Sequence, residues 1–220
     1  IIRTRHISNP IKHALAYSWL PDRLHVLNES ARQQFHDEHG VPWAKLGVFR
    51  PGVDLSRFEA LPSSAEARDQ LGLPREAFLF GNVAKFRPEK GHVTLLEAFG
   101  RIAHEHPEAH LVLAGEEIEP LAGIIRNAAR EIGLAERVHF LGYREDVPLI
   151  YRALDCFVLS SRSEAFGNVV LEAFAAACPV IATKAEGPRD IIRDGETGFL
   201  VEISNAEAMS AAMAALLDNR

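Results

Sequence analysis

Apolar residues follow two alternating patterns from residue 77 onward. Short continuous apolar runs predict buried strands at 77–84, 109–114, 137–141, 156–159, 179–183 and 199–201. Between these runs, apolar residues recur every three or four positions, which predicts amphipathic helices with stripes at 93–102, 121–132 and 209–216. Strands that alternate with helices are typical of βαβ units. The pattern therefore predicts an α/β fold, a Rossmann-like doubly wound parallel sheet.

A domain boundary is predicted near residue 50. Residues 51–75 are rich in proline, glycine and serine, and they predict a turn, a solvated helix and a second turn. We therefore divide the chain into residues 1–50, the incomplete end of a preceding domain, and residues 51–220, which contain the predicted sheet.

The first fifty residues contain too few apolar positions to bury a core of their own. A helical stripe passes through Leu27, Ala31 and Phe35, and residues 46–49 form an apolar strand. The chain starts at Ile1, without Met and without a signal-peptide pattern, so we expect it to be part of a longer protein.

Composition narrows the classes of protein to consider. The 220 residues are 47% hydrophobic and 25% charged, which is typical of a globular protein and excludes a disordered or fibrous chain. The net charge of −6 argues against nucleic acid as a partner. No apolar stretch reaches the roughly 20 residues of a membrane helix. Cys156 and Cys178 lie in apolar segments, which predicts buried thiols in a reducing, cytoplasmic compartment.

The loop after the first predicted strand is a candidate site, because open α/β sheets bind ligands where their strands end. Residues 81–91 contain Lys85, Lys90 and an arginine just before a predicted helix. Cations beside a helix N-terminus, which carries a partial positive charge, are suited to bind phosphate. A solvated basic loop would show the same residues, since the loop lacks a Gly-x-Gly-x-x-Gly pattern.

The loop after residues 156–159 is the second candidate. It carries Glu164 and, eight positions later, Glu172, with a helix predicted to begin near Gly167. Glu172 would lie about 6 Å along the helix from Asn168, at 1.5 Å per residue, so both carboxylates could border one pocket. A carboxylate within an apolar helix needs a partner, which a hydroxyl-rich ligand would supply. A local arginine or exposure to solvent is the alternative.

The two candidate loops are compatible with a single ligand. Carboxylates beside a diphosphate would repel it unless they contact another part of the molecule. A sugar nucleotide meets this condition: its diphosphate would contact the lysines and the amides of Gly167 and Asn168, while its hydroxyls donate to the carboxylates.

Three further segments carry candidate residues. The loop at 142–147 contains Tyr143 and Arg144, and its mixed polar and apolar character suits a nucleobase. Residues 186–198 are interpreted mainly as turns. The histidine-rich stretch at 104–110 flanks a proline between a helix and a strand, so we expect no metal site there.

The order and spacing of several motifs resemble the retaining glycosyltransferases of family 4. The motifs are Pro-Gly-Val-Asp at 51–54, the lysine loop at 85–91, Glu-x7-Glu with Phe-Gly-Asn between the two carboxylates at 164–172, and the segment at 187–200. The resemblance implies a GT-B architecture, with this chain supplying the nucleotide-sugar-binding C-terminal domain and only the end of the acceptor-binding N-terminal domain. The sequences of residues 3–6 and 185–189 resemble those of bacterial enzymes that build lipopolysaccharide and other surface glycans.

The same resemblance implies roles for individual residues. The catalytic residues would be Glu164, Lys90, Lys85 and His6. The donor would be bound by Lys85, Lys90, Phe166, Gly167, Asn168, Val169 and Glu172, and by Tyr143 and Arg144 of the loop at 142–147. The family more often has Arg at the position of Lys85 and Gly at that of Ala165, and its Gly-x-Gly after the second strand is Gly115-Glu116-Glu117 here.

The expected reaction is transfer of a sugar from a UDP-, GDP- or ADP-sugar to a hydroxyl of a glycan or lipid-linked acceptor, with retention and without a required metal or other cofactor. We expect a cytoplasmic protein. Any contact with the inner face of a membrane would be made by the part absent from this chain. We also expect this truncated chain to be inactive alone. Two alternatives stay open. One is a nucleotide-sugar-binding domain without catalysis. The other is a glycoside hydrolase with Glu164 and Glu172 as acid and base, which accounts for the carboxylates but not for the lysines.

Overall fold

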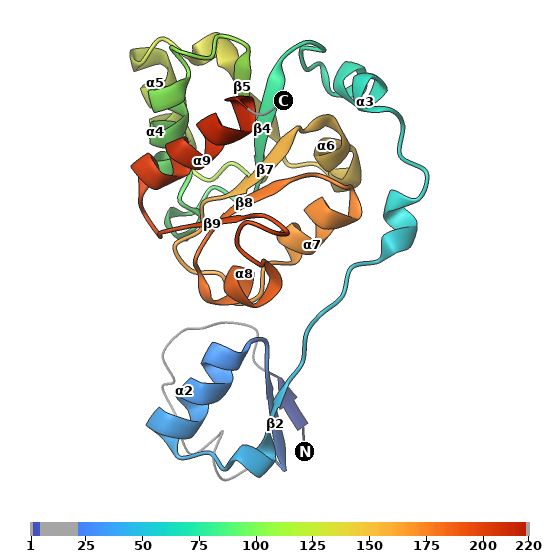
Figure 1. Ribbon diagram of the computed structural model, residues 1–220, viewed down its shortest axis with the longest axis vertical. Coiled ribbons are helices and arrows are strands. Elements are labelled where there is room, and N and C mark those ends of the chain that lie inside the picture. The colour runs from blue at the N-terminus through green and yellow to red at the C-terminus, as the bar shows by residue number, and fades with distance from the viewer. Residues whose placement is uncertain (1, 5–21, 219–220) are drawn as a thin grey trace.

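The computed structural model describes residues 2–4 and 22–218, which form two parallel β-sheets (Figure 1). The larger sheet has the strand order β6-β5-β4-β7-β8-β9, and all its pairings are parallel. In chain order its strands are β4 Phe78–Val83, β5 Ala109–Ala114, β6 Val138–Gly142, β7 Cys156–Leu159, β8 Val180–Thr183 and β9 Phe199–Val201. The strand order reverses direction after β4, as in doubly wound folds. The six predicted strands and the predicted fold class are confirmed.

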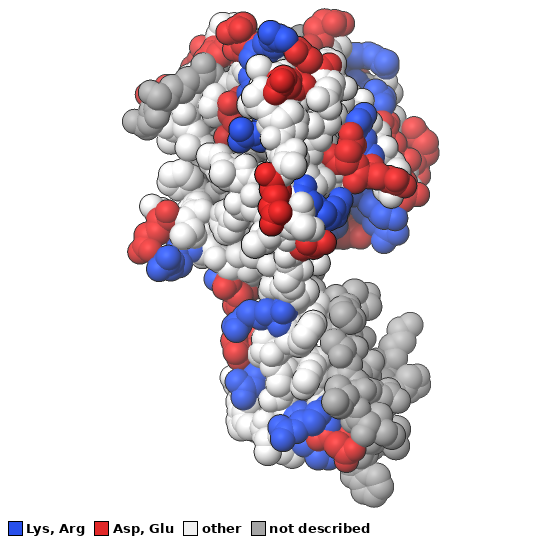
Figure 2. Space-filling view, turned by 90° about the vertical axis from the view of Figure 1, so that its right-hand side faces the viewer, with Lys and Arg blue, Asp and Glu red and all other residues white. Residues whose placement is uncertain are grey.

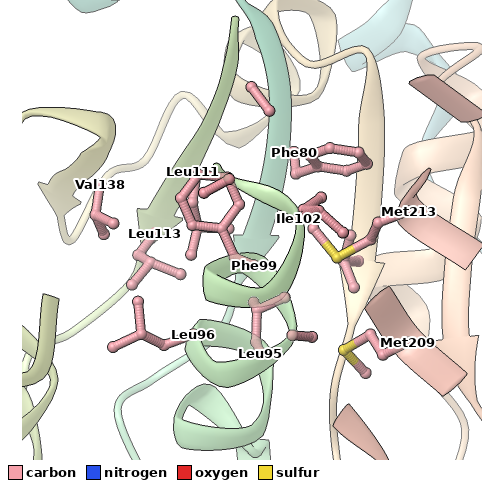
Figure 3. Packing of buried hydrophobic residues seen from close by; sticks show 14 of the residues in the cluster. Phe80, Leu95, Leu96, Phe99, Ile102, Leu111, Leu113, Val138, Met209 and Met213 are labelled. Carbon is pink, nitrogen blue, oxygen red and sulfur yellow. The ribbon is translucent and has the colours of Figure 1, made fainter. Parts of the chain in front are cut away.

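Helices cover both faces of this sheet, as the amphipathic stripes predict. One face is covered by α4 (His92–Ile102), α5 (Leu121–Glu131) and α9 (Ala206–Asp218). The other face is covered by α3 (Ser64–Leu71), α6 (Val147–Ala153) and α7 (Asn168–Ala175). Figure 3 shows side chains of β4, α4 and α9 meeting in the first of these cores, where Phe80, Phe99 and Met213 are fully buried.

The smaller sheet has the order β1-β2-β3, with β1 Ile2–Thr4, β2 Arg23–Val26 and β3 Leu46–Val48. Helix α2 (Glu29–His39) packs against it, and η1 (Trp43–Lys45) precedes β3. Of the predicted helical stripe, Ala31 and Phe35 lie in α2, but Leu27 lies before it. The helix begins after Asn28, which caps it by accepting a 2.6 Å hydrogen bond from the Ala31 amide. Among the described residues, the apolar core cluster of this unit consists of five buried residues, namely Leu24, Val26, Phe35, Val41 and Leu46.

Two short helices differ from the sequence expectations. Helix α3 is not simply solvated: its Arg68 is 6% exposed and forms a 2.7 Å ion pair with Asp155. The buried side of α3, with Ala67 and Leu71, explains why the segment packs on the sheet. Residues 186–191, expected to form turns, instead form helix α8 (Glu186–Ile191) after β8. A short 3-10 helix, η2 (Leu55–Phe58), lies in the linker before α3.

Cys156 and Cys178 are free and buried, as predicted. Over the described ranges 2–4 and 22–218, no helix is both long and apolar enough to cross a bilayer. On the face shown in Figure 2, lysines and arginines lie among aspartates and glutamates rather than in a continuous basic surface.

Candidate functional site

The loops that follow β4, β5, β6, β7 and β8 carry most of the predicted site residues. They lie at the end of the large sheet that faces the smaller unit (Figure 1). Three neighbouring pockets are found along this edge, and each contains some of the residues singled out from the sequence.

Lys90 and Glu164 come from different loops and meet in one pocket. Lys90 ends the 3-10 helix η3 (Pro88–Lys90) after β4, and Glu164 lies in the loop after β7. The Nζ atom of Lys90 donates to a carboxylate oxygen of Glu164 at 2.7 Å, and the two side chains are only 26% and 17% exposed. The pocket has a volume of about 300 Å³ and also includes Leu27 and Pro51. We call it the Lys90 pocket.

Gly91 allows the two loops of this pocket to approach closely. Its φ is 68°, and a Cβ atom at this position would lie 2.0 Å from the carbonyl oxygen of Ser160. The Ser160 hydroxyl donates to the Lys90 carbonyl at 2.8 Å, and the Arg162 amide donates to the Glu89 carbonyl at 2.8 Å. The backbone around Lys90 is therefore held directly against the loop that carries Glu164.

Helix α7 begins at the wall of the Lys90 pocket. Its N-cap residue, Gly167, has a φ of 93° and contributes no side-chain cap. Phe166, Gly167, Asn168 and Val169 all line the pocket. The first amides of a helix have no partner within it and carry a partial positive charge. Together with the Lys90 ammonium, they make this pocket suitable for an anionic group.

Glu172 lies on the second turn of α7, as predicted, and has a protein partner. The Tyr151 hydroxyl donates to its carboxylate at 3.1 Å. Burial raises the pKa of Glu172 above its usual value, while the hydrogen bond from Tyr151 and the nearby charge of Arg57 act in the opposite direction. Arg57, Asp54 and Asn168 line the same pocket, which has a volume of about 170 Å³. We call it the Glu172 pocket.

The two carboxylates do not share a single pocket, contrary to the sequence expectation. Glu164 lines the Lys90 pocket and Glu172 lines the Glu172 pocket, and Asn168, at the start of α7, borders both. The difference arises because Glu164 lies before the helix and turns toward Lys90, whereas Glu172 packs against Tyr151 of α6. The pockets are therefore neighbours that meet at the N-terminus of α7.

Lys85 lies in a third pocket, of about 150 Å³, together with Tyr143 and Arg144. Its Nζ atom forms a 2.6 Å ion pair with Glu116, and both side chains are more than half exposed. Arg144 pairs with Asp146, while Tyr143 is 69% exposed. We call this the Tyr143 pocket.

The expectation that both lysines face one phosphate site is not met by their present positions. Lys90 lines one pocket and Lys85 another, because Lys85 turns toward the loop after β5 and pairs with Glu116 there. The loop that replaces the family's Gly-x-Gly thus supplies two carboxylates to neighbouring cations: Glu116 to Lys85 and Glu117 to Arg126.

Sequence reasoning missed several residues of these pockets. It noted Asp54 only as part of a motif and gave no role to Arg57, although both lie in the linker that walls the Glu172 pocket. It also missed Tyr151 as the partner of Glu172, although a lone charge in an apolar helix signals that a partner exists. Asn28, whose side chain reaches the loop after β7, carried no recognisable signal.

The histidines have different outcomes. His6, expected near the transferred sugar, lies outside the described residues. Among the residues that are described, no group of three or more metal-ligating side chains is found, and His110 instead stacks on His139. His92 is 1% exposed and stacks on Phe86, and burial lowers its pKa to about 4. It is therefore neutral at physiological pH.

Residues 63–220 match the sequence profile of the family described as Glycosyl transferases group 1. The chain belongs to this family. It is 36% identical over 146 residues to the lipopolysaccharide core biosynthesis glycosyltransferase LpsE of Rhizobium meliloti (strain 1021), covering 66% of this chain and 41% of the relative. It is 34% identical over 212 residues to a D-inositol 3-phosphate glycosyltransferase of Thermomonospora curvata, covering 90% of this chain and 49% of the relative.

The fold is shared with a longer chain of known structure. The crystal structure of Anabaena Alr3699/HepE in complex with UDP and glucose superposes with a TM-score of 0.83 at 25% identity, covering 90% of this chain and 54% of that chain. The chain thus spans about half the length, or less, of the relatives it matches. The family assignment extends over α3 to α9, which includes the loops after β4, β5, β6, β7 and β8 but not Leu27, Asn28 or the linker that carries Pro51, Asp54 and Arg57.

Proposed function

We propose that this chain is the donor-binding part of a retaining glycosyltransferase that moves a sugar from a nucleoside diphosphate sugar to an acceptor hydroxyl. Residues 51–220 would form the donor-binding domain, and residues 1–50 the end of the acceptor-binding domain. The observation that carries the proposal is the Lys90 pocket, where an ammonium group, a helix N-terminus and a carboxylate lie together at the carboxyl ends of the strands. This combination suits a ligand with both anionic and hydroxyl groups.

In this proposal, the parts of the donor would occupy the three pockets. The diphosphate would lie against Lys90 and the first amides of α7, with Lys85 approaching from the neighbouring loop once it leaves Glu116. The ribose hydroxyls would donate to Glu172, whose carboxylate has only one hydrogen-bond donor among the described side chains. The nucleobase would lie in the Tyr143 pocket, whose lining includes apolar atoms of Val83, Val147 and Ile150.

The sugar would lie between Glu164 and the backbone of residues 166–169. When the glycosidic bond to the diphosphate breaks, negative charge grows on the departing phosphate oxygen. Lys90 and the amides of α7 would stabilise that charge, and one preorganised donor of this kind is worth roughly 3 to 4 kcal/mol of barrier. These groups would supply the charge that a divalent cation supplies in other phosphate-transfer sites, so we propose that no metal is required.

The acceptor is proposed from the relatives. LpsE is described by its role in lipopolysaccharide core biosynthesis, and the Thermomonospora enzyme by an inositol phosphate. We propose a glycan or lipid-linked acceptor in bacterial surface-glycan synthesis, in the cytoplasm and with any contact to the inner membrane face made outside this chain. The hydrolase alternative is weakened because each carboxylate already has a partner in the protein, Glu164 in Lys90 and Glu172 in Tyr151.

Calorimetric titration with UDP, GDP and ADP tests the proposal. We expect the chain to bind one of the three preferentially, and Lys90→Ala and Glu172→Gln to weaken that binding by tenfold or more, on the order of 1.4 kcal/mol for each decade. Lys184→Ala is the matched control, because Lys184 also forms a 2.7 Å ion pair but lies outside the three pockets. Binding that is equal for all three nucleotides and insensitive to both site variants would contradict the proposal.

A binding-only domain is separated from an enzyme by a second measurement. A protein that carries this chain together with an acceptor-binding domain should release nucleoside diphosphate from the matching sugar nucleotide only when an acceptor is present. The product should keep the anomeric configuration of the donor. Tight binding without any such transfer, over a panel of lipid-linked and free glycan acceptors, would favour the alternative of a domain without catalysis.

A further inference from the structure

Asn28, in the smaller unit, contacts the loop of the larger unit that carries Glu164. Its Nδ2 atom donates to the carbonyl oxygen of Ala165 at 2.5 Å, across 137 positions of sequence. Its Oδ1 atom accepts a hydrogen bond from the Ala31 amide and caps helix α2. The side chain is 1% exposed. The oxygen of this buried side-chain amide therefore binds within the smaller unit, and its nitrogen binds the larger unit.

A second contact lies beside the first. The amide of Glu29, at the start of α2, donates to the carboxylate of Asp190 in α8 at 3.2 Å. Helix α8 is itself tied to the same loop, because the Gly187 amide donates to the Glu164 carbonyl at 2.8 Å. The start of α2, the loop at 164–166 and helix α8 thus form a closed ring of contacts between the two units.

The position of Ala165 gives this ring a consequence for the Lys90 pocket. Ala165 lies between Glu164, which pairs with Lys90, and Phe166, which lines the same pocket. The hydrogen bond from Asn28 restrains the peptide plane between Ala165 and Phe166, and the hydrogen bond from the Gly187 amide restrains the plane between Glu164 and Ala165. Leu27, the neighbour of Asn28, lines the pocket as well, so the smaller unit forms part of its wall.

We propose that Asn28 is a positioning residue that holds the loop at 164–166 in its sugar-binding conformation when the two units are closed. The proposal rests on the function proposed above, in which this loop contacts the donor sugar. Units joined by a linker move relative to each other by default, and the Asn28 contact exists only when they are together. Closure of the smaller unit would therefore order the loop, and opening would loosen its hold on the sugar without touching the nucleotide.

Two variants separate this role from the capping of α2. Asn28→Asp keeps the capping oxygen but replaces the NH₂ donor with an acceptor that faces the Ala165 carbonyl. Asn28→Ser also keeps a good N-cap residue, and its side chain is too short to reach Ala165. Asn127→Asp is the matched control, because it makes the same chemical change on α5, where Asn127 forms an exposed contact with Arg130.

Hydrogen–deuterium exchange tests the contact without any ligand. In the full chain, the amides of Arg162 and Gly187, which donate to Glu89 and Glu164 and hold this loop in place, should exchange about five to ten times faster in Asn28→Asp and Asn28→Ser, roughly the effect of one typical net hydrogen bond. The Asn127→Asp control should match the wild type. Unchanged exchange of these two amides in both Asn28 variants would overturn the proposal, whatever the chain binds.

Titration tests the consequence for the donor. UDP, GDP and ADP, each with its glucose conjugate, are compared on the wild type and on both Asn28 variants. We expect the variants to bind the preferred nucleoside diphosphate within twofold of the wild type, and the conjugate about five to ten times more weakly, the same loss of one hydrogen bond. Equal losses for both ligands would assign Asn28 a general structural role. If the wild type binds no nucleotide, the proposed function fails, and the exchange experiment still decides whether Asn28 holds the loop.

Discussion

The Lys90 ammonium and the Glu164 carboxylate lie 2.7 Å apart and join the loop after β4 to the loop after β7. Because both side chains are mostly buried, removing one leaves the other with an uncompensated charge. The pair therefore has two separable effects: it stabilises the contact between the loops, and it keeps a positive charge at the N-terminus of α7, where a diphosphate would bind.

Replacing Lys90 with Ala should weaken binding of the preferred nucleoside diphosphate by about tenfold to a hundredfold. The reason is that hydrogen bonds to charged groups contribute about 1.5 to 3 kcal/mol. In the longer protein, turnover should fall severely as well. Calorimetric titration measures the first effect, and release of nucleoside diphosphate measures the second. Near-normal turnover would remove Lys90 from the proposed mechanism.

The double variant Lys90→Met with Glu164→Gln separates the two effects of the pair. It removes both charges together, so no unpaired charge stays buried and urea unfolding should show a stability close to that of the wild type. The affinity for nucleoside diphosphate should stay low. If the double variant regains affinity, Lys90 serves only to neutralise Glu164.

Glu172 should make folding stability depend on pH in a defined direction. Burial raises its pKa in the folded chain, so the folded state keeps this proton to a higher pH than the unfolded state does. Its contribution to stability is then full below the unfolded pKa and is lost as pH rises through the raised folded pKa. The stability of the wild type relative to Glu172→Gln should therefore fall over that range, in urea titrations at successive pH values.

Tyr151→Phe supplies the control for this titration. The Tyr151 hydroxyl stabilises the ionised carboxylate, so its removal should raise the pKa of Glu172 further and move the loss of stability to higher pH. An unchanged pH profile in Tyr151→Phe would mean that the hydroxyl does not bind the carboxylate in solution.

The fold could be predicted from the sequence because each strand and helix carries its own periodic signal. Strand β5, for example, is apolar apart from His110, and its other residues are buried because helices cover both faces of the sheet. Helix α8 was missed for a local reason: its six residues include Gly187 and Pro188, which are typical of turns. Neither Gly nor Pro prevents a single helical turn near a helix start.

The site could be predicted less completely, because spacing along the chain does not determine which loops pair. Glu164 and Glu172 lie eight positions apart, yet one turns toward Lys90 of a distant loop and the other toward Tyr151. Contacts of this kind depend on the strand order β5-β4-β7, which places the loops side by side. The contact of Asn28 with Ala165 depends in addition on the packing of two units, for which one sequence offers no periodic signal.

Lys85→Ala should affect ligand binding more than folding. Lys85 and Glu116 are both more than half exposed, and exposed ion pairs contribute little to stability. We therefore expect an unfolding midpoint close to that of the wild type. Nucleoside diphosphate should bind more weakly to Lys85→Ala than to a Glu116→Gln variant, which keeps the lysine and removes the charge of its partner. Equal affinities in the two variants would exclude Lys85 from the diphosphate site.

Gly187→Ala should destabilise the chain and disturb the loop at 164–166. A Cβ atom at this position would lie 2.2 Å from the carbonyl oxygen of Phe166 and 2.4 Å from its Cα, and these backbone atoms cannot move without shifting the loop. Overpacking of this kind costs about 1 to 3 kcal/mol. Gly100→Ala in α4 is the control, because its Cβ would meet only the flexible end of Ile132 at 3.3 Å, and Ala favours helix over Gly by about 1 kcal/mol. Urea unfolding should thus show a lower midpoint for Gly187→Ala and an equal or higher midpoint for Gly100→Ala. A wild-type midpoint for Gly187→Ala would show that α8 can move away from the loop at little cost in free energy.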